Sequence, residues 1–130
     1  MLLIIFLVLL LLLAQVGLPS RYLVAQIGPE AQMGPRDDLP PPGRELGRAR
    51  RALANLQETL PIFLVLAVLS IVLGEQGWLS LAGGGLYFVA RVLHVYCYMR
   101  GLAPWRSLSF LASLLGNVLL AIPLLPHIWS

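Results

Sequence analysis

The stretch RARRALANLQETLPIF, residues 48–63, places a row of polar side chains directly before an apolar run. Its residues Arg48, Arg51, Asn55 and Glu58 follow one another at steps of three, four and three. Such steps bring side chains to one face of an α-helix, because the helix turns once in about 3.6 residues. The stretch therefore predicts a helix that carries a polar stripe into an apolar environment.

The whole chain is too apolar for a water-soluble domain of its length. Of its 130 residues, 58% are hydrophobic and only 12% are charged, and the mean hydropathy is +0.84. Such a composition requires lipid as the surrounding solvent. Apolar segments that can contribute to membrane spans occupy residues 2–19, 60–74, 79–99 and 107–128. We therefore expect one all-α membrane domain over residues 1–130, a bundle of four transmembrane helices.

The second apolar segment is too short to cross a membrane by itself. Its 15 residues make a helix of about 22 Å, whereas the bilayer core is about 30 Å thick. The residues upstream are rich in good helix formers, so we extend this helix back to about residues 44–48. Residues 20–47 are then expected to form a loop, and its part dense in Gly and Pro, residues 27–43, is not expected to sustain a helix.

All arginines except Arg91, which lies within the third apolar segment, occur in two of the predicted connections and their flanks. These are residues 20–59 and 100–106, whereas the N-terminus, residues 75–80 and the C-terminal tail carry none. The positive-inside rule then places both arginine-bearing connections in the cytoplasm and both termini on the other side. Since membrane orientation explains the basic residues, nucleic acid is not an expected partner. The first segment lacks the clear cleavage signal of a secretory leader, so we expect it to remain as an anchor.

Further polar groups lie on the third and fourth segments. Arg91, His94 and Tyr98 stand at i, i+3 and i+7, so they share one helix face, and Arg106 and Ser107 begin the fourth helix. Arg91 fits either an ion pair with Glu58 or a role in ligand binding, and both can hold together. His94 alone is more typical of an interior histidine with hydrogen-bond partners than of a ligand-binding group. Tyr98 can equally be an anchor at the membrane interface.

Together, these groups indicate a cationic cavity near the cytoplasmic ends of three helices. Guanidinium groups suit a small anion with carboxylates, which would dock from the cytoplasm while an apolar co-substrate enters from the lipid. No Walker loop, no hydrolase motif and no cluster of metal-binding carboxylates is present, and the single cysteine, Cys97, excludes an internal disulfide. Metal chemistry and hydrolysis are therefore not supported.

These motifs resemble those of the MAPEG superfamily, the membrane-associated proteins in eicosanoid and glutathione metabolism. RALANLQE, residues 51–58, is similar to the R-x3-N-x2-E signature of the family's second helix. ARVLHVYCY, residues 90–98, and the following APWRS, residues 103–107, resemble the third and fourth helices of the prostaglandin E synthase branch. The loop and the short chain ends look more like those of small bacterial members, which implies the bacterial inner membrane.

The resemblance implies a homotrimer of four-helix subunits that binds glutathione between neighbouring subunits near the cytoplasmic face. It also implies a small hydrophobic electrophile as second substrate. By this resemblance Arg51 would pair with a glutathione carboxylate, and Arg106 with Ser107 would lie by the sulfur. The remaining groups of the implied glutathione site are Asn55, Glu58, Arg91, His94 and Tyr98.

The sequence departs from the eicosanoid members at several positions. Ala54 stands where the prostaglandin branch has a further arginine, Phe110 replaces a tyrosine, and Thr59 and Leu60 occupy positions where an aromatic residue is found. Three functions therefore remain open. The first is a glutathione-dependent transferase or peroxidase. The second is a non-catalytic module whose polar groups only hold helices and subunits together. The third, a small transporter, is the least favoured, because spans one and four carry no charges that could line a complete path.

Overall fold

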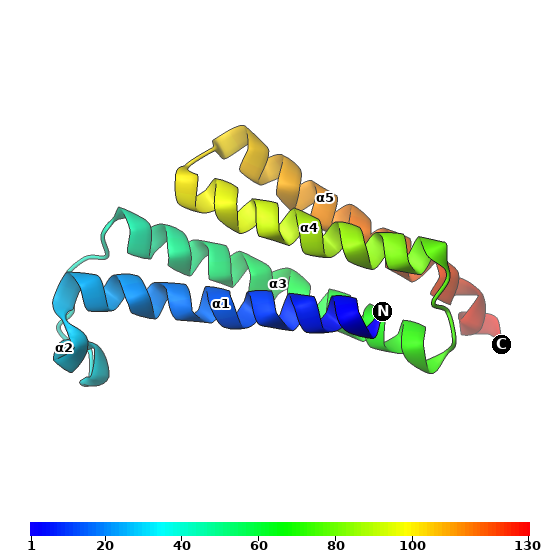
Figure 1. The fold of residues 1–130 in the computed structure, drawn as a ribbon, viewed down its shortest axis with the longest axis horizontal. Coiled ribbons are helices and arrows are strands. Elements are labelled where there is room, and N and C mark those ends of the chain that lie inside the picture. The colour runs from blue at the N-terminus through cyan, green and yellow to red at the C-terminus, as the bar shows by residue number, and fades with distance from the viewer.

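The computed structural model describes all residues, 1–130, and consists of helices without any strand (Figure 1). Four of its helical segments are long and apolar enough to cross a membrane, which confirms the expected all-α class. The elements are α1 (Leu2–Ile27), α2 (Pro29–Met33), α3 (Arg44–Val72), α4 (Trp78–Arg100), α5 (Ala103–Ala121) and the 3-10 helix η1 (Ile122–Trp129).

The long helices form two pairs that run along the same axis. In Figure 1, α1 lies beside α3 and α4 lies beside α5. The connection from α1 to α3 and the turn from α4 to α5 lie at one end of the bundle, which we call the arginine end because every arginine except Arg91 lies in or near it. The opposite end holds both termini and the connection from α3 to α4.

The region before α3 is more helical than the sequence predicts. Helix α1 continues through Pro19 to Ile27, and α2 forms within the Gly- and Pro-rich segment that was not expected to sustain a helix. Leu23 is buried where α1 runs beside α3, so tertiary packing extends α1 beyond its predicted end. In the last turn of α1, the side chain of Gln26 donates to the Pro41 carbonyl and accepts from the Gly43 amide, which closes the connection. Helix α3 begins at Arg44, within the predicted range.

The core lies where α1, α3 and α4 meet in the apolar half of the bundle. The rings of Phe63 and Tyr87 are stacked, with centroids 4.4 Å apart and an interplanar angle of 5°. The Tyr87 hydroxyl is 3.0 Å from that of Thr59 on α3, so the phenol has a polar partner although it is fully buried. Such a partner is required, because an unpaired buried hydroxyl costs about 1–3 kcal/mol. Ile5, Val8 and Leu120 complete this cluster from α1 and α5.

Two glycines allow α4 and α5 to approach backbone to backbone. A Cβ atom on Gly83 would lie 2.8 Å from the Gly116 carbonyl oxygen, and one on Gly116 would lie 2.7 Å from the Gly83 carbonyl oxygen. In lipid the hydrophobic effect does not drive helices together. Small residues at a helix crossing promote association there, because they allow close van der Waals packing. At the same end, His127 of η1 contacts Glu75 at 2.8 Å and ties the C-terminus to the connection between α3 and α4.

Replacing Gly116 by alanine should destabilise the bundle by about 1–3 kcal/mol, because the added methyl group meets backbone atoms that cannot give way. Gly85→Ala is the matched control, since nothing lies within 4 Å of a Cβ atom at that position. Alanine there should be neutral or stabilising by up to about 1 kcal/mol. Thermal unfolding in detergent measures both, and equal melting temperatures for the two variants would contradict the close crossing.

Candidate functional site

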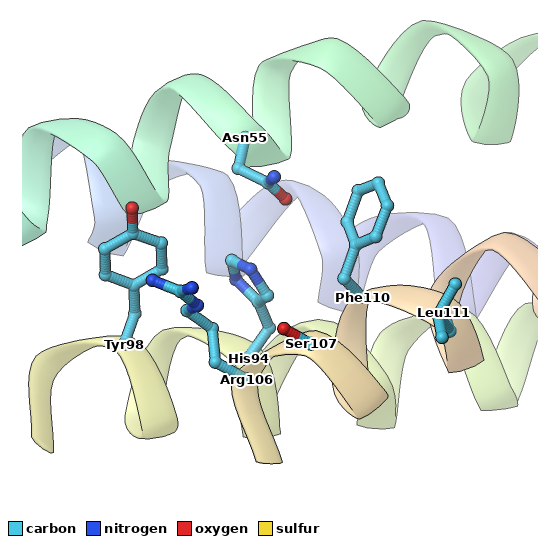
Figure 2. Close-up of a pocket in the computed structure, with 7 residues that line it drawn as sticks. All are labelled: Asn55, His94, Tyr98, Arg106, Ser107, Phe110 and Leu111. Carbon is cyan, nitrogen blue, oxygen red and sulfur yellow. The ribbon is translucent and has the colours of Figure 1, made fainter. Parts of the chain in front are cut away.

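A polar cavity of about 400 Å³ lies between α3, α4 and α5 at the arginine end. We call it the main cavity. Figure 2 shows that its side chains come from three helices and surround one space. It is lined by Asn55 of α3, His94 and Tyr98 of α4, and Arg106, Ser107, Phe110 and Leu111 of α5. The structure thus brings together five of the eight residues that the sequence proposed for the site.

Asn55 is held in place by the buried guanidinium group of Arg91. Arg91 is fully buried, and its Nη1 donates to the Asn55 side-chain oxygen at 2.8 Å. Arginine has only donors, so the amide has to present its oxygen to Arg91. The amide nitrogen of Asn55 is then the part that remains for a ligand, and it can only donate. Asn55 therefore selects a ligand atom that accepts hydrogen bonds, such as a carboxylate or carbonyl oxygen.

Tyr98 is the aromatic centre of the site. The guanidinium carbon of Arg106 lies 4.9 Å from the ring centroid and that of Arg51 lies 5.9 Å from it. Both distances fall within the range of cation–π attraction, which is about 6 Å. The ring of His94, one turn earlier on α4, lies 5.5 Å from the Tyr98 ring at a tilt of 58°. These contacts hold the cationic groups of α3 and α5 around one phenol.

Some buried polar atoms behind the cavity have no hydrogen-bond partner within the chain. They are Nδ1 of His94 and Nε and Nη2 of Arg91. Leaving a buried donor or acceptor unpaired costs about 1–3 kcal/mol, and more for a charged group. A ligand, water or a neighbouring subunit is therefore required to complete this region. The main cavity is also rich in donors and contains no carboxylate, a composition that suits a group with several acceptor atoms.

Glu58 lies outside both this cavity and the polar interface with α4. Its side chain is exposed and forms no ion pair, so the pairing with Arg91 that the sequence suggested is absent within one chain. The position facing α4 belongs instead to the next residue, Thr59, which contacts Tyr87. Arg91 donates to the amide oxygen of Asn55, and the ion pair with Glu58 was one of the two interpretations that the sequence left open for it.

A second, smaller cavity of about 250 Å³ adjoins the main cavity. It shares Tyr98 and Arg106 with the main cavity, and Arg51 lies here. We call it the triple-arginine cavity. Its lining residues are Arg48, Arg51, Cys97, Tyr98, Gly101, Ala103 and Arg106.

The walls of the triple-arginine cavity hold its arginines in place. Arg48 Nη1 donates to the Met99 carbonyl at 3.1 Å and so ties α3 to the end of α4. The side chain of Arg51 lies over Gly47. A Cβ atom added to Gly47 would be 3.1 Å from Nη1 of Arg51. Gly101 has a positive φ of 70° and forms the left-handed end of α4. A short turn thereby brings Arg106 of α5 back to the same place as Arg48 and Arg51.

The sequence prediction did not identify several polar groups of the bundle interior. Gln15 of α1 and Asn117 of α5 are buried, and both atoms of each amide lack a partner. An amide within an apolar run is itself a signal of an inward-facing position, because such a group is costly in lipid. The apolar wall of the main cavity, Phe110 and Leu111, carries no such signal, since these residues resemble any lipid-facing pair.

The arrangement can bind an anion, and nothing in it resembles a metal centre. No group of three or more His, Cys, Asp or Glu side chains is close enough together to hold a metal ion. The donors come from Asn55, Arg106 and the hydroxyl groups of Tyr98 and Ser107. All four groups can donate hydrogen bonds, and no acidic residue lies among them. They therefore favour a ligand with several oxygen or sulfur atoms that accept hydrogen bonds.

Comparison with known proteins identifies one family for this chain. The model of the MAPEG family matches residues 1–125 of the chain. No curated protein and no solved structure matches. The match covers the first three membrane-crossing helices and most of the fourth, and it confirms the resemblance drawn from the motifs of the second, third and fourth helices. The chain therefore belongs to the MAPEG family and is an integral membrane protein.

Proposed function

We propose that this protein is a glutathione-dependent transferase or peroxidase that acts on hydrophobic electrophiles within the membrane. The observation that carries the proposal is the main cavity, in which Asn55, His94, Tyr98, Arg106 and Ser107 converge from three helices without an acidic residue. Membership in a family associated with glutathione adds support.

Glutathione offers the chemistry that these groups lack. It has two carboxylates, amide oxygens and a thiol, so it supplies acceptors for the amide of Asn55 and for the arginines. Arg51, which is exposed beside Tyr98, would take a carboxylate in a two-pronged contact. His94 and the free donors of Arg91 lie behind this surface. Bound glutathione would supply a thiolate, the nucleophile of the reaction.

Arg106 and Ser107 are the proposed catalytic residues. A guanidinium group beside a thiol favours the thiolate and so lowers the pKa of the bound thiol. Each unit by which that pKa falls corresponds to about 1.4 kcal/mol of interaction. Ser107 adds a hydroxyl that can donate to the sulfur. Arg106 is well placed for this role, because its stacking against Tyr98 at 4.9 Å limits its motion.

The apolar substrate would reach the cavity from the lipid along α5. Leu111 lines the cavity and is 58% exposed, so one side of the cavity borders the surface that faces the acyl chains. Phe110 beside it offers an aromatic wall. This border between a cationic hollow and an apolar surface suits a reaction between a polar thiolate and a hydrophobic electrophile.

A homotrimer would account for the exposed Glu58. An exposed carboxylate on a membrane-crossing helix costs about 2.5 kcal/mol or more when it faces acyl chains, and Glu58 has no partner within its own chain. In a trimer its face of α3 would lie against a neighbouring subunit, where Glu58 would bind the amino group of glutathione. The arginine end would face the cytoplasm, with both termini outside, in the inner membrane of a bacterium.

A non-catalytic role is the second candidate, and one contact favours it. The hydrogen bond between Arg91 and Asn55 joins α3 to α4 without any ligand. The polar groups therefore already stabilise the bundle. The two roles differ at Arg106, which forms no hydrogen bond to another side chain and so contributes little to packing beyond its stacking on Tyr98.

Arg106→Ala should reduce the thiolate that bound glutathione forms. In wild type we expect saturable binding heat and an ultraviolet thiolate signal near neutral pH. The variant should shift the thiol titration upward by about one unit, roughly a tenfold loss of thiolate below the pKa. Arg50→Ala is the control, because Arg50 is exposed and lines neither cavity. Absence of glutathione heat in wild type would rule out the enzyme.

Glu58→Gln should weaken glutathione binding by about tenfold, the loss of one charge-assisted contact of about 1.4 kcal/mol. Glu45→Gln on the same helix is the matched control, since Glu45 lies in the first turn of α3 and lines neither cavity. Co-expressed Glu58→Gln and Arg106→Ala chains test whether the site is shared. Mixed trimers should regain part of the activity, whereas no recovery would place both residues in one subunit.

A further inference from the structure

The buried face of α1 carries one polar side chain, that of Gln15. The other buried residues of this helix are Ile5, Val8 and Leu23. Gln15 is 2% exposed, and neither its amide oxygen nor its amide nitrogen has a hydrogen-bond partner. A buried amide is costly unless both atoms are satisfied, and more so at membrane depth, where bulk water is absent. The interior beside Gln15 therefore has to supply a donor and an acceptor.

The packing of the core places Gln15 at the depth of His94. Val8 of α1 and Tyr87 of α4 belong to one core cluster, and both helices begin at the opposite end of the bundle. Gln15 follows Val8 by seven residues, and His94 follows Tyr87 by seven residues. Seven residues make nearly two turns and about 10.5 Å of helix, so each pair shares a face. In Figure 2, α1 runs behind the main cavity between α3 and α4, and it is in contact with both.

The unpaired atoms at this depth are mostly donors. Arg91 lies one turn before His94, and while its Nη1 is taken by Asn55, its Nε and Nη2 remain unpaired. Both of these atoms only donate, as does the amide nitrogen of Gln15. The acceptors are the amide oxygen of Gln15 and the ring nitrogen that carries no proton in a neutral imidazole. Nδ1 of His94 is the buried, unpaired ring nitrogen. As an acceptor it reduces the surplus of donors, whereas as a donor it would enlarge that surplus.

We infer that Gln15 is a positioning residue whose amide, together with Arg91, holds His94 in the tautomer that carries its proton on Nε2. These side chains form no direct hydrogen bond with one another, so one buried water links them. That water accepts from Arg91 and from the amide nitrogen of Gln15, and it donates to Nδ1 of His94.

The consequence of this arrangement lies in the main cavity. His94 lines that cavity, and Nε2 is not among its buried atoms, so the Nε2–H group is a donor to a ligand there. The use of this donor in catalysis rests on the proposed function, in which it would bind a carbonyl or carboxylate oxygen of glutathione. The tautomer itself does not depend on that function, because Gln15 and Arg91 set it from behind the cavity.

Gln15→Glu should reverse the tautomer, because a carboxylate only accepts and so provides a partner for an Nδ1–H group. The ratio of the two tautomers should shift by about tenfold or more, since a charge-assisted hydrogen bond replaces a neutral one. Nuclear magnetic resonance of the full chain in detergent, with ¹⁵N-labelled histidine and no glutathione, measures this ratio. The chain has two histidines, and His127→Gln assigns their signals. The spectra are recorded at about pH 8, above the range in which imidazoles usually titrate.

Asn117→Asp is the matched control. It makes the same change from amide to carboxylate at a second buried side chain whose two polar atoms lack partners, on α5. The tautomer of His94 should remain that of wild type in this variant. An equal shift in Asn117→Asp, or an unchanged ratio in Gln15→Glu, would overturn the inference. Wild type with the proton on Nδ1 would overturn it too, whether or not the variants fold.

Titration of the same samples with glutathione separates this inference from the proposed function. If both are correct, Gln15→Glu should bind glutathione about tenfold more weakly, because one donor to the ligand is lost. A tautomer that reverses as expected in a protein that binds no glutathione would support the role of Gln15 and reject the proposed function. Wild type that binds glutathione but carries the proton on Nδ1 would reject the role of Gln15 alone.

Discussion

The hydrogen bond between Arg91 and Asn55 is the contact around which the arginine half of the bundle is arranged. A guanidinium group with no exposed surface, in the middle of an apolar helix, requires a polar partner, and α3 supplies one at 2.8 Å. That contact fixes the register of α3 against α4. One turn further along α3, Thr59 then meets the hydroxyl of Tyr87, and one more turn brings Phe63 onto the Tyr87 ring.

The same contact has a chemical consequence for the site. Because Arg91 takes the oxygen of the Asn55 amide, only the nitrogen is left for the cavity. The other lining groups of α4 and α5 are the imidazole of His94, the guanidinium group of Arg106, two hydroxyl groups and two apolar side chains. A bundle whose interior charge is positive and whose donors exceed its acceptors is prepared for an anion. The family assignment agrees with this, since glutathione is an anion with several acceptors.

The two ends of the bundle differ in how closely their helices approach. Near the opposite end, Gly83 and Gly116 bring the backbones of α4 and α5 into contact. At the arginine end, the large side chains of Tyr98 and Arg106 stand between the helices and leave two adjoining cavities. Close packing is thus found at the glycine crossing and in the Phe63–Tyr87 core, while the arginine end keeps two cavities between its helices.

Composition and helix propensity were enough to predict the membrane class, the four helices and the beginning of α3 near Arg44, because these depend on local properties of the chain. The direction of each polar side chain depends on where the neighbouring helix lies. Around the axis of α3, Glu58 is about 60° to one side of Asn55 and Thr59 about 40° to the other, so the spacing alone does not decide between them. Helix α4 packs on the side of Thr59, which leaves Glu58 exposed. Likewise, only tertiary packing of Leu23 explains why α1 continues past Pro19.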